Sequence, residues 1–435
     1  MRPPRALPTG LPGRQLAAAL SCAVLTACLA AAAAAVGAGG TGHSAATHRF
    51  VRPTSIAAGT EITHFSPTGK LTVYWRGNGH GHGMSQYGAR GAALKGLSAK
   101  QILAFYYPGT LLATLPASVI RVYLSVAGRD TTVLANSRGL ALSGYGTMPT
   151  RGYNQFRLVP SGSGLAVQGH TPAGRWRTLR TGLPSQADFS SDYGWVELVL
   201  SDGSTTRYHG RVGAVRSGSG ELTINRVHME QYVQGSVPRE VPASWPNATL
   251  QAQAIAARTY ADVSRVESGS GSQYDICDNT MCQMYGGMAH YDSRGNLLYR
   301  DDPAVTSGNG RVVLRYRGRP VFAQYSASNG GATVDGGEPY LIGRNDPYDT
   351  AASGDPYLSE NERVRAAALA SAYHLKSVSS VQVTKRDGNG PWGGRILSAI
   401  VNGRTSAGKA AHVSTTGFDL GSAFGVYTDY LRIGS

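Results

Sequence analysis

Glu240 is the residue best suited to chemistry, because its carboxyl group lies in a short segment between two prolines. Pro238 and Pro242 stand two positions to either side of it and Trp245 follows, so we expect a rigid turn beside an aromatic ring. Partial burial raises the pKa of a carboxyl group, which can then hold a proton near neutral pH and donate it to a leaving group. A solvated turn residue close to the start of a helix is the alternative interpretation. Residue type and spacing alone leave both open.

A glycine-dense loop from Gly77 to Gly88 contains two alternating histidines, His80 and His82. Alternation allows both imidazoles to face one direction, where they can bind a metal ion. No third ligand is evident in the sequence, so we predict no metal site in this loop.

Cys277 and Cys282 are the two cysteines that remain once the N-terminal segment is set aside. One close pair in an exported protein predicts a disulfide. Two thiolates do not complete a tetrahedral zinc site, so zinc at this pair is the alternative and no cofactor is predicted.

The N-terminal segment has the layout of a secretory signal. A basic start with three arginines is followed by an apolar, alanine-rich stretch from Leu16 to Val36 and then by small residues. The sequence therefore predicts a signal peptide at 1–38 and an exported protein, secreted or associated with the cell wall, that contacts the membrane only through this segment. The apolar run is nearly long enough to span a membrane, so an uncleaved anchor stays an alternative, as does a lipid anchor at Cys28.

The chain is basic, with a formal net charge of +15 that falls to +12 without residues 1–38, because these hold three arginines and no acidic residue. A basic exported protein is attracted to polyanions, and the cell wall is one. A general bias in composition explains the charge equally well. The basic residues are dispersed and form no long run, so we expect no nucleic-acid partner.

Abundant glycine (57 residues), sparse charge (15%) and many short apolar alternations predict a strand-rich α+β fold. The length of 435 residues suits two or three packed modules. We divide the chain into segments, listed here in order: a linker at 39–68, a glycine- and histidine-rich segment at 69–115, a β-rich module at 116–215, and a region at 216–435 that contains Glu240 and ends in strands.

Two helices are expected around Glu240. A short helix from Met229 to Gln234 is predicted to stop at Gly235. A longer helix is predicted after Ser244 as its N-cap, with small residues at spacings of three and four on one face. Such a face allows another backbone to approach closely.

Three ordered blocks of sequence resemble the SpoIID/LytB family. The first runs from Gln231 to Ala261 and contains VPREVPASW followed by LQAQAIAARTYA, the second spans Tyr274 to Gly287, and the third spans Ala323 to Thr333. Three blocks in order are far more specific than any single short motif. The resemblance implies a SpoIID-like core in which a short helical segment carries the active site and the β-rich module is an insertion.

Within this family the SpoIID enzymes are lytic transglycosylases that act on glycan strands stripped of stem peptides, and their acid/base glutamate corresponds to Glu240. The resemblance therefore implies a peptidoglycan lytic transglycosylase with glycan strands as substrate. One carboxyl group suffices for this reaction, because the 6-hydroxyl of muramic acid is the nucleophile. Asp275 and Asp278 are weaker candidates for an electrostatic helper.

LytB-type members are described as amidase enhancers instead. A non-catalytic protein that binds the cell wall and assists other wall hydrolases is therefore the alternative function.

The resemblance also implies residues that bind sugar hydroxyls or the lactyl carboxylate. In the second and third blocks these are Gln283, Tyr285, Ser326, Ser328 and Asn329. The glycine-dense loop is similar to another family segment, which adds His80, His82, Ser85 and Gln86 as groove residues. Some relatives bind zinc near the cysteine pair with the help of histidine, but Met281 stands where they tend to carry it, and this favours the disulfide.

The order of the segments departs from the family. The glycine–histidine segment usually comes near the C-terminal end of the domain, whereas here it precedes the other blocks. We therefore predict a circular permutation. The strand at Leu71–Trp75 should lie against C-terminal strands near Leu431, and the loop with His80 and His82 should line the same groove as Glu240.

Overall fold

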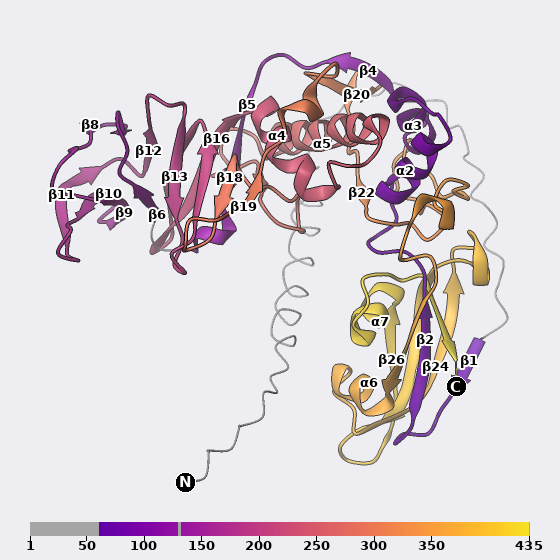
Figure 1. Ribbon diagram of the computed structural model, residues 1–435. Helices are drawn as coiled ribbons and strands as arrows, with labels where there is room; N and C mark the ends of the chain where they lie inside the picture. Colours follow the sequence, from indigo (N-terminus) through magenta and orange to yellow (C-terminus); the bar gives the residue numbers. More distant parts are fainter. Residues whose placement is uncertain (1–60, 129–131, 435) are drawn as a thin grey trace, which may run out of the picture. The chain divides into compact units, whose positions relative to one another are not determined.

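The computed structural model describes residues 61–128 and 132–434. The predicted signal peptide and most of the predicted linker lie outside these ranges. Within them the chain is α+β, with many more strands than helices (Figure 1). The end of the predicted linker is a strand, since β1 (Glu61–His64) pairs with β24 (Ser377–Arg386). No helix in the described ranges is both long and apolar enough to cross a membrane.

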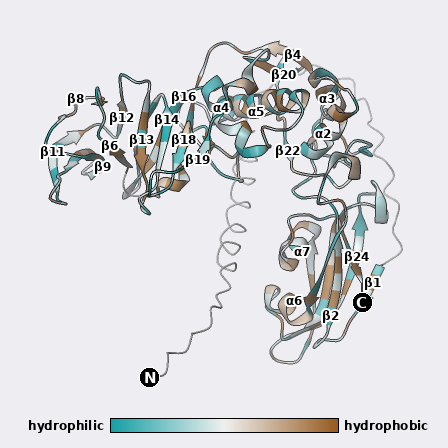
Figure 2. Ribbon diagram, viewed as in Figure 1, coloured by the Kyte–Doolittle hydropathy of each residue, from teal (hydrophilic) through white to brown (hydrophobic). Residues whose placement is uncertain are grey.

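Two large sheets pack against each other and share one hydrophobic core. Buried residues alternate with less buried ones along their strands, as in β13 (Trp195–Val199), where the apolar Val196 and Leu198 are buried on either side of Glu197 (Figure 2). The first sheet has the order β11 (Trp176–Leu183), β10 (Gly164–His170), β9 (Gln155–Ser161), β6 (Thr132–Ala135), β13 (Trp195–Val199), β14 (Thr205–His209), β18 (Ala289–Tyr291), β19 (Leu297–Arg300). The second has the order β17 (Ile276–Cys277), β5 (Val119–Tyr123), β16 (Gly220–His228), β15 (Arg211–Ser217), β12 (Gln186–Ser190), β7 (Ala141–Leu142), β8 (Gly146–Thr147). Strands β16 to β19 belong to these sheets, which therefore run past the expected boundary at residue 215.

Helix α5 (Asn247–Ser268) is buried on two sides. Its residues Ala254, Ala257 and Ala261 belong to the core of the two sheets. Ala252 and Ala256 belong to a second core, shared with α2 (Gln86–Leu94), α3 (Ala99–Tyr106) and β20 (Val312–Tyr316). The sequence predicted one face of small residues, whereas the run of alanines serves two, because alanine lets neighbours approach from both sides and favours the helix.

Helix α4 (Met229–Glu240) continues past Gly235, where the sequence predicted its end. A side chain at Gly235 would lie 2.5 Å from the carbonyl oxygen of Gly287, so this glycine permits close packing and does not stop the helix. Pro238 lies inside the helix and has no N–H for the carbonyl of Gln234. That carbonyl accepts a hydrogen bond from the N–H of Asp302 at 3.1 Å instead. Tertiary contacts thus carry the helix to Glu240.

The C-terminal strands form a separate cluster with the first described ones. Strand β2 (Lys70–Trp75) lies between β23 (Glu360–Arg365) and β27 (Leu431–Gly434), with Trp75 opposite Leu431. This pairing confirms the predicted contact between the Leu71 strand and the end of the chain. A neighbouring sheet has the order β1, β24, β25 (Ile396–Arg404), β26 (Ala410–Thr416). Helices α6 (Ala366–Ala372) and α7 (Gly417–Phe424) pack together on β24 and β25 (Figure 1).

The glycine-dense loop leads from β2 into β3 (Met84–Ser85), which pairs in parallel with β22 (Tyr325–Ser326). Gly83 has φ +64°, and a side chain there would lie 2.2 Å from the carbonyl oxygen of Gln324, so only glycine fits. Ser85 then caps helix α2 by accepting a hydrogen bond from the N–H of Gly88. This short parallel pair joins the N-terminal segment to the third sequence block.

Candidate active site

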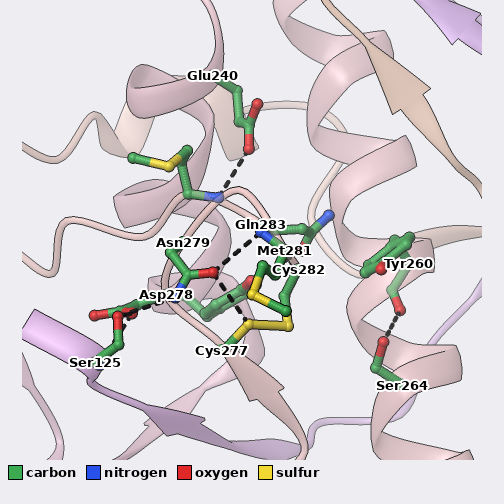
Figure 3. The surroundings of a disulfide bond; sticks show 12 residues. Ser125, Glu240, Tyr260, Ser264, Cys277, Asp278, Asn279, Met281, Cys282 and Gln283 are labelled. Carbon is green, nitrogen blue, oxygen red and sulfur yellow. Dashed lines mark hydrogen bonds between the residues drawn. A yellow bond between two sulfur atoms is a disulfide. The ribbon is translucent and has the colours of Figure 1, made fainter. Parts of the chain in front are cut away.

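Glu240 is the last residue of α4, and its carboxyl group meets segments from distant parts of the chain. Oε1 accepts a hydrogen bond from the backbone N–H of Met284 at 2.9 Å (Figure 3). Oε2 accepts one from the side-chain amide of Gln86 at 3.1 Å, although the two residues are 154 positions apart. The hydroxyl of Tyr325 also donates to this carboxyl group. Three parts of the chain therefore converge on one acid.

Burial is the largest influence on Glu240 and raises its pKa, while the three hydrogen bonds act in the opposite direction. The position at the end of α4 adds to burial, because the carbonyl end of a helix carries partial negative charge. Glu240 lies neither in the rigid turn that its prolines predicted nor in a solvated turn near a helix start, because it is the last residue of α4 and Pro238 lies inside that helix. Glu240 is partly exposed as a residue and its carboxyl group tends to keep its proton, which are two conditions for donating that proton to a ligand.

Tyr325 is a contact of the acid that the sequence analysis missed. Its hydroxyl accepts a hydrogen bond from the side-chain amide of Gln283 at 3.0 Å and donates to Glu240. The available signal was its position in the third block, directly before Ser326. Only the pairing of β22 with β3 brings it to the acid together with Gln86.

Ser85, Ser328 and Asn329 lie in a buried polar network and not on an open groove. The hydroxyl of Ser85 and the backbone N–H of Asn329 both donate to Oδ2 of Asp349 at 2.9 Å. The hydroxyl of Ser328 donates to Asp355 at 2.5 Å. Buried hydroxyl and amide groups need such partners. The expected contact of these three residues with sugar is therefore corrected to a role in fixing the loop and the start of α2.

Gln283 and Tyr285 are buried as well, at 2% and 5% exposure. Gln283 accepts a hydrogen bond from the hydroxyl of Tyr232 at 2.8 Å, and Tyr285 donates to the side-chain carbonyl of Asn225 at 2.8 Å. Both side chains support the segment next to Glu240 from inside and do not face a surface that a sugar can reach. Ser326 is 8% exposed, and its hydroxyl has no hydrogen-bond partner among the described residues.

His80 and His82 pack against each other in the glycine-dense loop, with ring centroids 4.9 Å apart. The backbone N–H of His82 donates to Nδ1 of His80 at 3.0 Å. Burial, together with the smaller effects of the charges of His82 and Arg395, lowers the pKa of His80 to about 3, so its ring is neutral. The Nδ1 atom of His82 lies 3.2 Å from the side-chain oxygen of Gln324. Of the loop residues proposed for the groove, Gln86 is the one with a hydrogen bond to Glu240.

Cys277 and Cys282 form a disulfide with a Cα–Cα distance of 5.4 Å. The two aspartates considered as helpers are engaged near it, because Asp275 forms a salt bridge with Arg121 and Asp278 accepts hydrogen bonds from Ser125. These contacts do not support a helper role at Glu240. In the ranges that the structure describes, no group of three or more His, Cys, Asp or Glu side chains is arranged to hold a metal ion.

An aromatic cluster forms around Tyr87, the residue that follows Gln86 in the chain. The ring of Tyr87, next to Gln86, lies 5.0 Å from Trp245 and 6.1 Å from Tyr357, and the guanidinium group of Arg90 lies 5.5 Å from the Trp245 ring. All three rings are partly exposed. The sequence suggested an aromatic neighbour in Trp245, but Tyr87 and Tyr357 join it only through the tertiary fold.

The sequence model of the SpoIID family, described as stage II sporulation protein, matches residues 217–316. This range begins in β16, ends in β20 and includes Glu240 and the disulfide. The chain contains a domain of the SpoIID/LytB family. The glycine-dense loop, Tyr325 and the C-terminal strands lie outside the matched range of the SpoIID domain.

Two curated relatives are similar to the chain. The stage II sporulation protein D of Bacillus subtilis is 29% identical over 203 residues, which are 43% of this chain and 57% of that protein. The amidase enhancer of the same organism is 38% identical over 123 residues, which are 27% of this chain and 15% of that protein. The chain thus spans little more than half of the first relative and a small part of the second.

Proposed function

We propose that the protein is an exported peptidoglycan lytic transglycosylase in which Glu240 is first the general acid and then the general base. The observation that carries this proposal is the surroundings of Glu240. It is partly exposed, burial raises its pKa, and it accepts hydrogen bonds from Met284, Gln86 and Tyr325. In the described part of the chain no other carboxyl group hydrogen-bonds to it, which suits a reaction that needs one acid.

In the proposed reaction, protonated Glu240 donates its proton to the glycosidic oxygen that leaves C1 of muramic acid. As the bond between C1 and that oxygen breaks, the 6-hydroxyl of the same sugar attacks C1. The carboxylate then takes the hydroxyl proton, which restores the acid. The products are a 1,6-anhydromuramic end and a new free sugar end, and neither water nor a second carboxylate takes part.

The neighbours of Glu240 have distinct roles in this proposal. The amide of Met284, the amide of Gln86 and the hydroxyl of Tyr325 hold the carboxylate in one orientation after its proton has left. We assign the partly exposed rings of Tyr87, Trp245 and Tyr357 to the apolar face of a sugar, since flat aromatic surfaces bury such faces well. No metal or cofactor is required in this scheme.

A non-catalytic amidase enhancer is the second candidate function. The 38% identity to the amidase enhancer of Bacillus subtilis favours it. In this case the domain would bind glycan strands in the cell wall and assist another wall hydrolase without cleaving them.

Incubation of the purified protein with glycan strands stripped of their peptides separates the two candidates. Mass spectrometry of the products is expected to reveal anhydromuramic ends from the wild-type protein and none from the Glu240→Gln variant. Binding of intact strands without such ends, together with stimulation of an added amidase, would support the second candidate instead.

A further inference from the structure

The disulfide lies two residues before the amide that contacts Glu240. Cys282 is followed by Gln283 and then by Met284, whose backbone N–H donates to Oε1 of Glu240 at 2.9 Å (Figure 3). Nothing else in this stretch of backbone reaches the acid through a hydrogen bond. The orientation of this one amide therefore depends on the backbone on both sides of it, from the disulfide before Gln283 to Tyr285, whose N–H donates to the carbonyl of Asp278 at 3.2 Å.

The other end of the disulfide is anchored on a sheet. Cys277 belongs to β17, which pairs in parallel with β5, with Cys277 opposite Tyr123. The next residue, Asp278, accepts hydrogen bonds from the N–H and the hydroxyl of Ser125, at 3.0 and 2.5 Å. Cys277 thus stays in place whether or not it is bonded to Cys282.

The loop between the cysteines has two contacts beyond its own residues. The side-chain amide of Asn279 donates to the hydroxyl of Ser125 at 3.0 Å, and the carbonyl of Asp278 accepts a hydrogen bond from the N–H of Tyr285 at 3.2 Å. The N–H of Cys282 donates to the carbonyl of Asn279 at 2.9 Å, and the N–H of Met281 donates to the Asn279 side chain at 3.0 Å. Met281 is 46% exposed. The disulfide is the covalent link between β17 and the backbone just before Met284, and the hydrogen bond from Tyr285 to Asp278 joins the two segments just after it.

We propose that the Cys277–Cys282 disulfide is a positioning element for the acid, which holds the Met284 amide against Glu240 and makes the activity sensitive to reduction. The proposal rests on the proposed function of Glu240. Reduction by a dithiol breaks the S–S bond and yields two thiols, while the dithiol gives up two electrons and two protons and becomes a cyclic disulfide. The fold persists, because Gln283 remains anchored to Tyr232 and Tyr325 by its own hydrogen bonds.

A kinetic signature distinguishes positioning from general stabilisation. The hydrogen bond from Met284 lowers the pKa of Glu240, against the larger effect of burial. Loss of this bond lets the pKa rise, so the alkaline limb of the kcat profile moves to higher pH. We expect kcat to fall about tenfold, since one hydrogen bond to a charged group is lost, with KM changed by less than about twofold.

The test compares the wild-type protein, oxidised and reduced with dithiothreitol, with Cys277→Ser/Cys282→Ser and with Met281→Ser. The last variant is the matched control, because it alters the same exposed loop and keeps the disulfide. Reduced wild-type and the double variant should show the lower kcat and the shifted limb, and dithiothreitol should not change the double variant further. Equal kcat values and equal pH limits in all samples would overturn the proposal.

Hydrogen exchange supplies a measurement that needs no turnover. The amide of Met284 should exchange slowly in the oxidised protein and faster in the reduced protein, the double serine variant and Glu240→Ala, which removes the acceptor. Unchanged exchange after reduction would refute the positioning role even if Glu240 proves not to be catalytic. If Glu240→Gln cleaves at the wild-type rate, the proposed function fails, but this exchange experiment still decides the role of the disulfide.

Met284→Pro provides a second test if the serine variant does not fold. Proline removes the N–H, while both cysteines stay in place. Met284→Pro should reproduce the kinetics of the reduced protein, and the Met281→Ser control should again keep those of the oxidised protein. A Met284→Pro variant with the kcat and alkaline limb of the wild type would contradict the proposal.

Discussion

Glu240 and Asp349 are acidic residues that bond to neighbouring positions of the chain, Gln86 and Ser85, but their surroundings are opposite. Glu240 is partly exposed and accepts its hydrogen bonds from three distant segments. Asp349 is 1% exposed, hydrogen-bonds with Asp355 and lies close to Asp346. Burial raises the pKa of both, and for Asp349 the hydrogen bond and the charge of Asp355, with the charge of Asp346, bring it to about 8.

The comparison teaches that a raised pKa alone does not identify a catalytic acid. The Asp349 site is closed by the hydroxyls of Ser85 and Ser328 and by the backbone of Asn329, so a substrate cannot reach it. Its proton has a structural use, because it allows adjacent carboxyl groups to be buried together. Glu240 has a similar tendency to keep its proton but is partly exposed as a residue, and exposure is a condition for giving the proton to a ligand.

The largest expected effect comes from Glu240→Gln. Glutamine is nearly isosteric but cannot donate the proton, so cleavage of peptide-free glycan strands should fall by about 10²–10⁴-fold while strand binding persists. Asp349→Asn is the matched control, a change from carboxyl to amide at a closed site, and should retain most of the activity. Release of anhydromuramic ends, measured by mass spectrometry, checks both. A wild-type rate of strand cleavage in Glu240→Gln would show that Glu240 is not the catalytic acid.

Asp349→Ala should lower the stability of the buried Asp349 network and should affect the cleavage reaction less. It leaves the N–H of Asn329 buried without an acceptor and the hydroxyl of Ser85 with only the carbonyl of Ala327, at 3.5 Å, which should lower the free energy of unfolding by about 3 kcal/mol. Asp349→Asn retains an acceptor oxygen and should cost less than about 1 kcal/mol. Denaturant unfolding of both variants provides the measurement. Similar losses in the two would show that the hydrogen bonds to Asp349 are not what stabilises this network.

The pH dependence of stability should also distinguish Asp349. Its pKa is about 8 in the folded protein, against about 3.9 in an unfolded chain, so the folded state binds more protons between these values. The stability that Asp349 contributes is therefore present below about pH 4 and is lost as the pH rises to about 8. Asp349→Asn lacks this titration. Its melting temperature should fall less than that of the wild type between pH 5 and pH 8.5, and parallel curves would contradict the assigned shift.

Gln86→Leu should have the smallest effect of the four. It removes the hydrogen bond from Gln86 that lowers the pKa of Glu240, so the alkaline limb of the activity profile should move to higher pH. Activity should fall about tenfold at most, because the bonds from Met284 and Tyr325 remain. Gln86→Glu sharpens the test, since a second carboxyl group beside Glu240 should move the limb further in the same direction. An unchanged pH profile of activity in both variants would show that Gln86 does not influence Glu240.

Several features of this protein followed from the sequence by itself. The alternation of apolar residues predicted a strand-rich α+β fold, because each strand must bury one of its faces. Glu240 stood out through its prolines and through the blocks around it, and the cysteine pair through its close spacing. Ser98 and Gln101 form a capping box at the start of α3, a local pattern of serine followed three residues later by glutamine. All these signals are local, since the residues involved lie close together in the chain.

The tertiary structure decided which polar residues reach the acid and which are buried. Ser85 and Gln86 are adjacent in sequence and were both predicted for the groove, yet one donates to Asp349 and the other to Glu240. The direction of each side chain depends on the pairing of β3 with β22, a contact between segments about as far apart in sequence as any in the site. Helix α4 reaches Glu240 for the same kind of reason, since Asp302 satisfies a carbonyl that Pro238 leaves open. Hydrogen bonds between distant segments leave no periodic pattern in the sequence, and only the assembled fold determines them.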